Sequence, residues 1–453
     1  MAGIFKAYDI RGAYPDELDE QMARRIGAAF VRLLNARSIV VGRDMRLSAS
    51  VLSQAFIQGA VSSGAAVADL GLTSTPLLYY AIIDGRFDGG AMVTASHLPG
   101  GMNGLKLCRE KAIPLSGDQG LPELERLVKE GRPMEQEATA KGSCQEIDML
   151  ERYIAGLRAF VHDPKVLRIA VDAGNGMAGP EILALFQRVP EWQLVPLYME
   201  PDGSFPHHIA NPLLVSATRD LQAMVIREKA DIGVAFDGDA DRCGFIDEKG
   251  ERIPEDLVTA LIAEFLLTKE PGATILYDLR SSRVVPETIT RLGGRAVRTR
   301  VGHAFIKARM REINALFAGE LSGHYYHRDM GFTDNAIFTM IQMLNLLTLK
   351  RQPLSDLIHP LQKYYATGEI NIQVQDADAI FSALEAQYKD ARKDHLDGLS
   401  MDYDSWWFNL RASNTEPLIR LNLEANDAAT RAEKKKEILE TIGKADPSMK
   451  VEQ

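Results

Sequence analysis

A strand, helix and strand in the same order occur three times along this chain, and this repeat constrains the fold more than any other feature. The three predicted copies lie at 38–44, 48–62 and 65–70, at 167–172, 180–186 and 193–197, and at 273–278, 284–292 and 296–300. Apolar, β-rich runs that alternate with helices predict parallel or mixed α/β layers. A spacing of roughly 100 to 130 residues fits one domain per copy.

Each copy continues into a further strand that ends in a polar loop. The predicted strands at 90–93, 231–236 and 315–318 precede loops at 94–97, 237–242 and 319–324. Open α/β sheets bind ligands at the carboxyl ends of their strands. One such loop could be an ordinary turn, but three at matching positions favour a shared ligand site.

The last part of the chain has a different pattern. From about Tyr364 we expect a smaller α+β domain with its strands and helices at 369–374, 377–392, 406–412, 418–425 and 428–442. A chain of 453 residues is too long for one hydrophobic core. We therefore predict three similar α/β domains with mixed sheets, at 1–148, 149–251 and 252–363, and a fourth α+β domain at 364–453.

Composition excludes several classes of function. The formal net charge of −10 provides no electrostatic footprint for nucleic acid. We find no apolar run of membrane-spanning length, and the first residues do not resemble a secretory signal. Three widely spaced cysteines indicate neither a disulfide framework nor a zinc site. We expect a cytoplasmic protein that binds a small molecule, with no nucleic-acid or membrane partner; monomer and dimer both stay open.

Asp237, Asp239 and Asp241 stand at alternate positions of one loop. Carboxylates so close in sequence repel one another unless a cation lies between them, and oxygen ligands suit Mg²⁺ or Ca²⁺. An EF-hand is one alternative, since Glu248 falls at its twelfth position, but Arg242 occupies the glycine position and a strand precedes the loop. A solvated acidic turn is the other alternative. Beside a metal, Arg242 could bind phosphate.

Ser96 is followed directly by His97, which suggests an activated nucleophile. Side chains of sequence neighbours seldom face each other, however, so Ser96 alone is more typical of a turn and gains a chemical role only if the aspartate loop brings a metal to it. By the same reasoning Lys106 alone indicates a surface charge, and His303 indicates a structural residue or a helix cap.

Two further loops allow functional interpretations. The glycine-rich run Gly174–Gly179, with Glu200 further on, resembles a dinucleotide-binding turn and makes a nicotinamide-dependent oxidoreductase an alternative. A tight structural turn, with Pro180 opening the helix, explains the same residues. The loop from Arg411 to Pro417 combines arginine, hydroxyl and amide groups that could bind an anion, with Arg420 on the following strand; a polar hairpin turn is the alternative.

Taken in order, these motifs resemble the α-D-phosphohexomutase family, in particular the bacterial phosphomannomutase/phosphoglucomutase group. The resemblance covers nearly the whole chain, from Lys6–Gly12 through the serine, glycine and aspartate loops to Gly319–His324 and Arg411–Pro417. It implies three similar α/β domains and a fourth domain of the TATA-binding-protein type, arranged around a central cleft. It also implies that the glycine run is a structural turn.

The resemblance assigns roles by position. Ser96 matches the serine that carries the phosphoryl group, and Ser96, Asp237, Asp239 and Asp241 match the Mg²⁺ ligands. Two other catalytic positions, Lys106 and His303, match residues that act as general acid and base. Arg11 and Arg242, also catalytic positions, match residues that surround the phosphoryl group together with Tyr8. Sugar recognition falls to Glu320, Ser322 and His324. The clamp on the non-reacting phosphate comprises Arg411, Ser413, Asn414 and Thr415. The predicted substrate-binding set also includes His97, Arg280 and Arg420.

The implied activity is an intramolecular phosphotransferase that interconverts the 1-phosphate and 6-phosphate of mannose or glucose through a hexose 1,6-bisphosphate. Two positions depart from the family pattern: Leu98 stands where many members have asparagine, and Arg280 where many bacterial members have lysine.

The nearest alternative is a phosphoglucosamine mutase, although those members usually carry glutamine at the position of Leu321. An oxidoreductase and a non-catalytic sugar-phosphate-binding homologue are alternatives of other classes.

Overall fold

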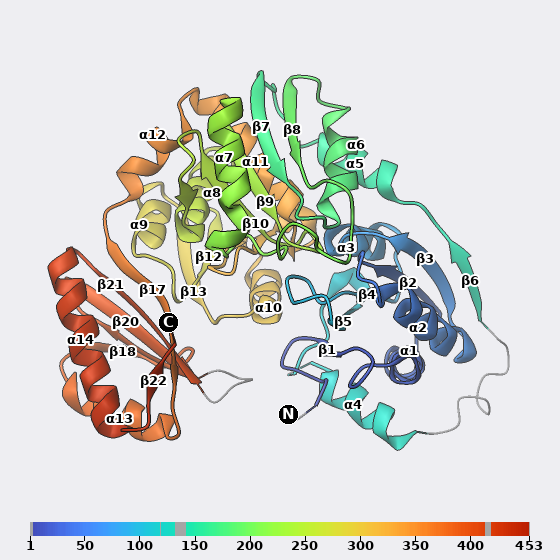
Figure 1. Cartoon of the computed structure of the whole chain (residues 1–453), viewed down its shortest axis with the longest axis horizontal. Helices are drawn as coiled ribbons and strands as arrows, with labels where there is room; N and C mark the ends of the chain where they lie inside the picture. Colours follow the sequence, from blue (N-terminus) through green and yellow to red (C-terminus); the bar gives the residue numbers. More distant parts are fainter. Residues whose placement is uncertain (1–2, 118, 132–141, 413–417, 453) are drawn as a thin grey trace.

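The computed structural model describes residues 3–117, 119–131, 142–412 and 418–452. The chain forms four domains in sequence order, each built on its own β-sheet (Figure 1). No helix in these four segments combines the length and the hydrophobicity needed to cross a bilayer.

The first domain has a six-stranded mixed sheet in the order β1-β5-β4-β2-β3-β6. Its strands are β1 (Ile10–Ala13), β2 (Ser38–Arg43), β3 (Ala66–Leu72), β4 (Gly89–Val93), β5 (Met102–Arg109) and β6 (Ser143–Glu146). Its helices are α1 (Glu20–Leu34), α2 (Ala49–Ser62), α3 (Thr75–Asp84) and α4 (Leu121–Glu130). All five residues of β4 are buried, as expected of a central strand covered on both faces.

The second and third domains have five-stranded sheets, in the orders β11-β10-β9-β7-β8 and β13-β12-β14-β15-β16. The strands of the second domain are β7 (Leu167–Asp172), β8 (Trp192–Leu197), β9 (Ile232–Phe236), β10 (Cys243–Asp247) and β11 (Arg252–Ile253), and its helices are α5 (Leu150–Arg158), α6 (Ala178–Phe186) and α7 (Val215–Glu228). Those of the third are β12 (Thr274–Asp278), β13 (Arg295–Thr299), β14 (Phe317–Gly319), β15 (Tyr325–His327) and β16 (Thr333–Asp334), with α8 (Glu255–Lys269), α9 (Val284–Arg291), α10 (His303–Ile313), α11 (Ala336–Lys350) and α12 (Leu354–Ile358).

The three sheets share one topology. In each, the first strand of the repeat (β2, β7 or β12) pairs in parallel with the second (β3, β8 or β13) on one side and with the third (β4, β9 or β14) on the other. The third strand then turns through its polar loop into an antiparallel partner, β5, β10 or β15. The threefold repeat is therefore confirmed, and the three polar loops occupy equivalent positions.

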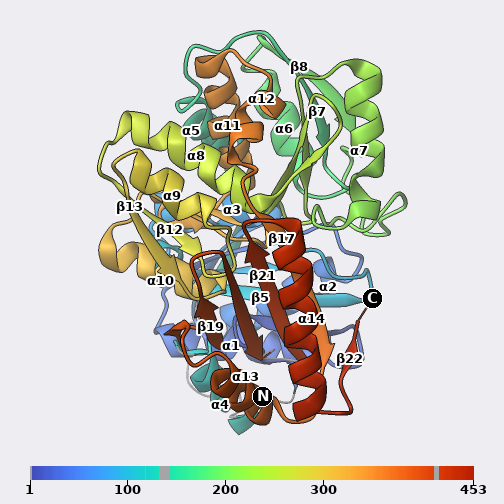
Figure 2. The same ribbon diagram turned by 90° about the vertical axis from the view of Figure 1, so that its left-hand side faces the viewer.

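The fourth domain is an antiparallel sheet in the order β18-β19-β20-β21-β17-β22. It contains β17 (Tyr365–Gln373), β18 (Arg392–Asp394), β19 (Leu399–Asp402), β20 (Trp406–Ala412), β21 (Leu418–Ala425), β22 (Lys450–Val451), α13 (Ala377–Gln387) and α14 (Ala428–Ala445). Both helices cover the face of the sheet that is turned away from the other domains (Figures 1 and 2). The predicted helix at 377–392 is too long: it ends at Gln387 because Tyr388 turns into the core against Trp406 and Phe408.

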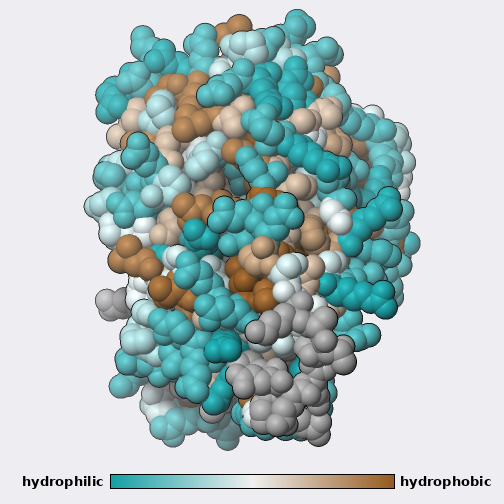
Figure 3. All heavy atoms as spheres, turned by 90° about the vertical axis from the view of Figure 1, so that its right-hand side faces the viewer, coloured by the Kyte–Doolittle hydropathy of each residue, from teal (hydrophilic) through white to brown (hydrophobic). Residues whose placement is uncertain are grey.

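The cores differ between domains. Apolar side chains of the second and third domains form one continuous cluster, in which Ile169 and Phe338 both take part, while the fourth domain has a separate cluster around Phe408. On the face that Figure 3 draws, most of the surface is hydrophilic, and hydrophobic side chains gather near the middle.

Candidate active site

Ser96 lies in the polar loop after β4 with an unusual backbone conformation. Its φ of 53° falls in the left-handed region, which side-chain-bearing residues rarely adopt. Its N–H donates to Thr94 Oγ1 at 2.9 Å, and the Thr94 hydroxyl donates to Asp44 Oδ2 at 2.6 Å. Strain of this kind persists only where neighbours over-determine the conformation, and it concentrates at functional sites.

Arg46 anchors the backbone of the same loop through hydrogen bonds. Its buried guanidinium donates to the carbonyl oxygens of Ser96 at 2.8 Å and Leu98 at 2.6 Å, and to those of Pro99 and Met102 at 2.9 Å each. No role was predicted for Arg46 or Asp44. Their position directly after the first strand of the repeat, at the ligand-binding edge of the sheet, was the available hint, but residue type alone does not show that they are buried.

The three aspartates of the loop between β9 and β10 lie together and are buried. One carboxylate oxygen from each of Asp237, Asp239 and Asp241 lies within 4.8 Å of the others. The Ser96 hydroxyl donates to Asp237 Oδ2 at 2.7 Å, so two domains meet at this point. Among the described residues, Asp239 Oδ1 has no hydrogen-bond partner, while Asp241 Oδ1 has the ion pair with His324 as its contact. Buried, unpartnered carboxylate oxygens are the donor set that suits a hard divalent cation such as Mg²⁺.

Lys106 on β5 is buried, although read alone it indicated a surface charge. Its Nζ lies 2.6 Å from Asp239 Oδ2 and also contacts Asp241 Oδ2. Burial alone would lower the pKa of Lys106, but these carboxylates outweigh it and raise the pKa, so the ammonium group stays charged. The same ammonium holds the pKa of Asp241 well below its usual range against burial, whereas burial and the other two carboxylates raise that of Asp237.

Thr75, which the sequence analysis did not single out, fixes the aspartate loop to the first domain. Its hydroxyl donates to Asp239 Oδ2 at 2.5 Å and its N–H donates to the Asp239 carbonyl at 3.0 Å. It is the first residue of α3, after the N-cap Ser74. The positive end of a helix therefore faces this acidic loop.

His97 faces Ser96, contrary to the expectation for sequence neighbours. Its Nδ1 lies 3.2 Å from Ser96 Oγ. The left-handed conformation of Ser96 accounts for this, because it departs from the extended geometry in which successive side chains point to opposite sides. Burial and Arg242 lower the pKa of His97, so the ring is neutral and can accept a hydrogen bond.

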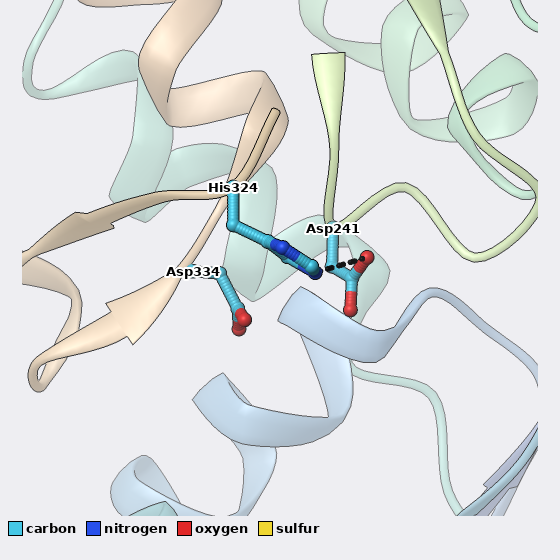
Figure 4. Close-up of side chains that lie close together, drawn as sticks. All are labelled: Asp241, His324 and Asp334. Carbon is cyan, nitrogen blue, oxygen red and sulfur yellow. Dashed lines mark ion pairs between the residues drawn. The ribbon is translucent and has the colours of Figure 1, made fainter. Parts of the chain in front are cut away.

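His324 joins the aspartate loop to the polar loop of the third domain. Its Nε2 lies 3.4 Å from Asp241 Oδ1. In Figure 4 the His324 ring lies between Asp241 on one side and Asp334 on the other. Its Nδ1 lies 2.8 Å from Ser322 Oγ and 3.5 Å from Glu320 Oε2. Burial and Arg242 lower the pKa of His324, but the two carboxylates outweigh them and raise it to about 9.

Glu320 is buried yet ionised. It accepts hydrogen bonds from the Gly302 N–H at 3.2 Å and the Tyr326 hydroxyl at 2.8 Å. Burial raises its pKa, but His324 and Arg280 bring it below the usual range. Arg242, on the aspartate loop, lies with its Nε 3.8 Å from Asp237 Oδ2.

Three more predicted residues border this region. Tyr8, from the first domain, donates to the Val301 carbonyl at 3.3 Å, and its ring centroid lies 5.5 Å from that of His303. His303 opens α10, and its Nδ1 has no partner among the described residues. Burial and the charge of Lys307 hold its pKa well below the usual value. Arg11 pairs with Asp9 at 2.6 Å, and the charges of Asp239 and Asp241 help to raise its pKa against burial.

Glu369 on β17, for which no role was predicted, forms ion pairs with three of the arginines that were predicted to bind substrate. Its carboxylate lies 3.1 Å from Arg280, and 3.3 Å from both Arg411 and Arg420. Burial raises the pKa of Glu369, but the three guanidinium groups lower it to about 2. Arg280 also pairs with Asp278 at 2.7 Å, so it connects the third domain to the fourth. The predicted clamp residues Ser413, Asn414 and Thr415 lie outside the described residues.

The glycine-rich turn packs on the aspartate loop. A Cβ on Gly176 would lie 2.8 Å from the Gly238 carbonyl oxygen, and the Met177 N–H donates to that oxygen at 2.9 Å. The close approach that this glycine permits is therefore to the protein's own backbone, which explains the turn without a dinucleotide. The EF-hand alternative is wrong, because a strand precedes the loop and the Glu248 carboxylate accepts from Ser355 on α12.

Comparisons with known proteins agree with this arrangement. Sequence models of phosphoglucomutase/phosphomannomutase match residues 2–134 (alpha/beta/alpha domain I), 151–250 (domain II), 254–365 (domain III) and 369–441 (C-terminal domain). A phosphomannomutase of Salmonella montevideo is 40% identical over 97% of this chain and 98% of its own length.

Solved structures give the same result. The crystal structure of a phosphoglucomutase/phosphomannomutase family protein from Burkholderia thailandensis has a TM-score of 0.90 at 33% identity, and covers 99% of this chain and 98% of its own. An N-acetylphosphoglucosamine mutase of Aspergillus fumigatus, solved with glucose 1,6-bisphosphate, shares the fold with a TM-score of 0.61 at 13% identity, over 98% of this chain and 96% of its own. With four matched domains in family order and a relative 40% identical over nearly its whole length, this chain belongs to the phosphoglucomutase/phosphomannomutase family.

Proposed function

We propose that this protein is a phosphohexomutase that interconverts hexose 1-phosphates and hexose 6-phosphates through a phosphoserine at Ser96. One observation carries the proposal: the Ser96 hydroxyl lies 2.7 Å from Asp237 at the edge of three buried carboxylates. The loop that carries Ser96 has a strained backbone, which the Arg46 guanidinium anchors by hydrogen bonds. A turn serine does not need that arrangement, whereas a phosphoryl carrier that works beside a metal does.

Asp237, Asp239 and Asp241, together with a phosphoryl group on Ser96, would hold Mg²⁺. When bound, Mg²⁺ would neutralise negative charge that develops on the transferring phosphoryl oxygens. The buried Asp239 Oδ1, which has no hydrogen-bond partner among the described residues, supports this assignment.

The protonation states of Lys106 and His303 suggest separate roles. In the first transfer the bond from phosphorus to Ser96 Oγ breaks, a bond from phosphorus to the sugar hydroxyl oxygen forms, and the hydroxyl proton leaves. His303, held neutral with a free Nδ1, suits the base that takes this proton. Lys106, held charged beside the aspartate loop, suits the group that neutralises charge and protonates the departing Ser96 Oγ. The second transfer reverses these steps and returns the other phosphate to Ser96.

Substrate recognition divides between the third and fourth domains. The ionised Glu320 and the Ser322 hydroxyl are suited to hold sugar hydroxyls. We assign the non-reacting phosphate to Arg411, Arg420 and Arg280 together with Ser413, Asn414 and Thr415, since guanidinium groups bind phosphate in a bidentate manner. One sugar site and one phosphate clamp can hold the sugar in either of two opposite orientations, with a hexose 1,6-bisphosphate as the intermediate that turns over.

The proposed substrates are the phosphates of mannose and glucose, in the cytoplasm. The curated relative named above supports mannose, and Leu321 in the sugar loop argues against glucosamine. Steady-state kinetics with mannose, glucose and glucosamine phosphates tests this choice, and a preference for glucosamine 6-phosphate would favour a phosphoglucosamine mutase instead. Domain boundaries after residues 148 and 363 form part of the proposal; the expected boundary after residue 251 lies too early, because β11 (Arg252–Ile253) pairs with β10 in the sheet of the second domain.

Intact-mass analysis and two serine variants test the mechanism. We expect phosphate to map to Ser96, and Ser96→Ala to have no measurable turnover while it keeps the wild-type circular dichroism spectrum. The matched control is Ser62→Ala in the same domain, whose hydroxyl donates to the Gly59 carbonyl within its own helix, and it should keep full activity. Turnover by Ser96→Ala at the wild-type rate would exclude the phosphoserine mechanism.

A further inference from the structure

A cavity of about 350 Å³ lies between the first and second domains, apart from the candidate active site. A volume of this size falls within the range of small-molecule sites. The lining comes from the end of β3 and the start of α3, from the segment that links the two domains, and from the start of α6. Most of the lining side chains are apolar, among them Leu72, Ile147, Met177 and Pro180.

Glu181 and Thr73 line this cavity and are almost completely buried. Glu181 is 2% exposed and Thr73 is 3% exposed, and neither Glu181 Oε2 nor Thr73 Oγ1 has a hydrogen-bond partner among the described residues. Burial raises the pKa of Glu181 to about 8, although hydrogen bonds from Ser74 oppose the shift. A buried carboxyl without an opposite charge therefore stays largely protonated near neutral pH, and a positive charge beside it would let it ionise.

The two ionisable residues of the cavity lining are both acidic. Asp148 is the second ionisable residue of the lining, and no lysine, arginine or histidine belongs to it. One oxygen of Asp148 accepts from the Leu150 N–H at 2.8 Å, and Glu181 Oε2 is the buried carboxyl oxygen of the lining that has no hydrogen-bond partner among the described residues. An anionic ligand would be repelled by Asp148, and a neutral apolar ligand would leave Glu181 Oε2 without a hydrogen-bond partner.

We propose that this cavity binds a small organic cation, an ammonium group on a compact apolar body, with Glu181 as its counter-ion. The apolar walls would cover the body of the ligand, and the Thr73 hydroxyl would accept a second hydrogen bond from the ammonium group. Neither residue belongs to the proposed catalytic machinery.

The cavity lies directly behind the aspartate loop. Two residues after Thr73, Thr75 donates to both the side chain and the backbone of Asp239, and Met177 in the cavity wall donates to the Gly238 carbonyl. A ligand that presses on these walls acts on the loop that we assign to Mg²⁺, so we expect the bound cation to change the rate of the mutase reaction. This consequence rests on the proposed function, whereas the binding itself does not.

Isothermal titration of the full-length protein with benzylamine and benzyl alcohol tests the proposal. The titrations contain saturating Mg²⁺ and an equilibrated mixture of hexose phosphates, so that the active-site aspartates are already occupied. We expect benzylamine to bind, and benzyl alcohol, which has the same ring without the charge, to bind at least roughly tenfold more weakly. Failure of benzylamine to bind, or equal affinities for the two compounds, would overturn the proposal.

Two glutamine variants locate the binding. Glu181→Gln keeps the side-chain shape and removes the charge, and it should lose the preference for the amine. Glu191→Gln is the matched control, since Glu191 is in the same domain and also has an unpartnered Oε2 but does not line the cavity; it should bind as the wild type does. Unchanged amine affinity in Glu181→Gln contradicts the proposal. The mutase rate without amine, measured separately, tests the proposed function alone.

Discussion

Replacing Lys106 by methionine removes the positive charge that now balances Asp239 and Asp241, while methionine keeps much of the apolar stem. The Lys106 ammonium lies 2.6 Å from Asp239 Oδ2 and contacts Asp241 as well, and both carboxylates are buried. Breaking a buried pair by deleting one partner costs about 3–5 kcal/mol, because the remaining charge is left uncompensated. For a domain as large as the first domain, which contains Lys106, that loss of free energy corresponds to a decrease in melting temperature of roughly 10 °C in the absence of Mg²⁺.

The variant should respond to Mg²⁺ more strongly than the wild type. Without the Lys106 ammonium group beside the aspartates, less positive charge repels Mg²⁺, so we expect Mg²⁺ to bind the variant more tightly. When the Mg²⁺ concentration is 100 times the Kd for Mg²⁺, its binding adds about 2.7 kcal/mol to the free energy of unfolding. Scanning calorimetry with EDTA and with Mg²⁺ measures both effects. Turnover should be lost in either condition, since the proposed proton donor is gone.

An exposed lysine provides the control for this experiment. Lys129 pairs with Glu125 at 2.6 Å, but its side chain is 72% exposed, so Lys129→Met should cost less than about 1 kcal/mol. If Lys106→Met melts in EDTA within about 2 °C of the wild type, and its Mg²⁺ response is no larger, then Lys106 does not balance the aspartates and our assignment of the site's charges is wrong.

Three further changes have defined outcomes. Glu181→Gln should stabilise the protein at alkaline pH. The pKa of Glu181 is about 8 in the folded state against an ordinary 4.5, so folding loses stability as the pH rises from 4.5 to 8. The variant, which lacks this loss, should exceed the wild type by roughly 4 kcal/mol at pH 8 and match it near pH 4.5, as urea unfolding at the two pH values would show. Gly238→Ala should reduce kcat about a hundredfold, because the new Cβ would lie 2.6 Å from the Ser96 carbonyl oxygen and displace the serine loop; wild-type kcat would contradict that packing. Arg280→Lys should raise the KM for hexose phosphate roughly tenfold, since one ammonium group cannot replace the planar fork that reaches both Asp278 and Glu369, and an unchanged KM would show that this bridge does not order the clamp.

The strand and helix pattern could be predicted well because it is local. Buried strands such as β2, β4 and β9 are continuous apolar runs, so three copies of one unit were visible along the chain. The three polar loops followed from the same pattern. The end of α13 could not be predicted, because it depends on Tyr388 packing against aromatic side chains of β20.

The residues that the sequence analysis missed depend on contacts between distant segments. Arg46 reaches carbonyl groups more than fifty positions away, and Glu369 meets Arg280 across 89 positions and two domains. A single arginine or glutamate in a strand or loop looks the same whether it faces solvent or a buried partner. The left-handed backbone of Ser96, which turns His97 toward it, also has no signature in residue type.

The anchoring of Ser96 has a consequence for how the two half-reactions can succeed each other. Four backbone carbonyl groups, three in its loop and one at the start of β5, accept hydrogen bonds from one buried guanidinium, which holds the backbone of the proposed phosphoryl donor in place. In the proposed mechanism the sugar moves instead: between the two transfers the bisphosphate would rotate end over end while it stays inside the protein. A fixed nucleophile thus assigns the movement between the two half-reactions to the intermediate, which has to stay bound while it turns.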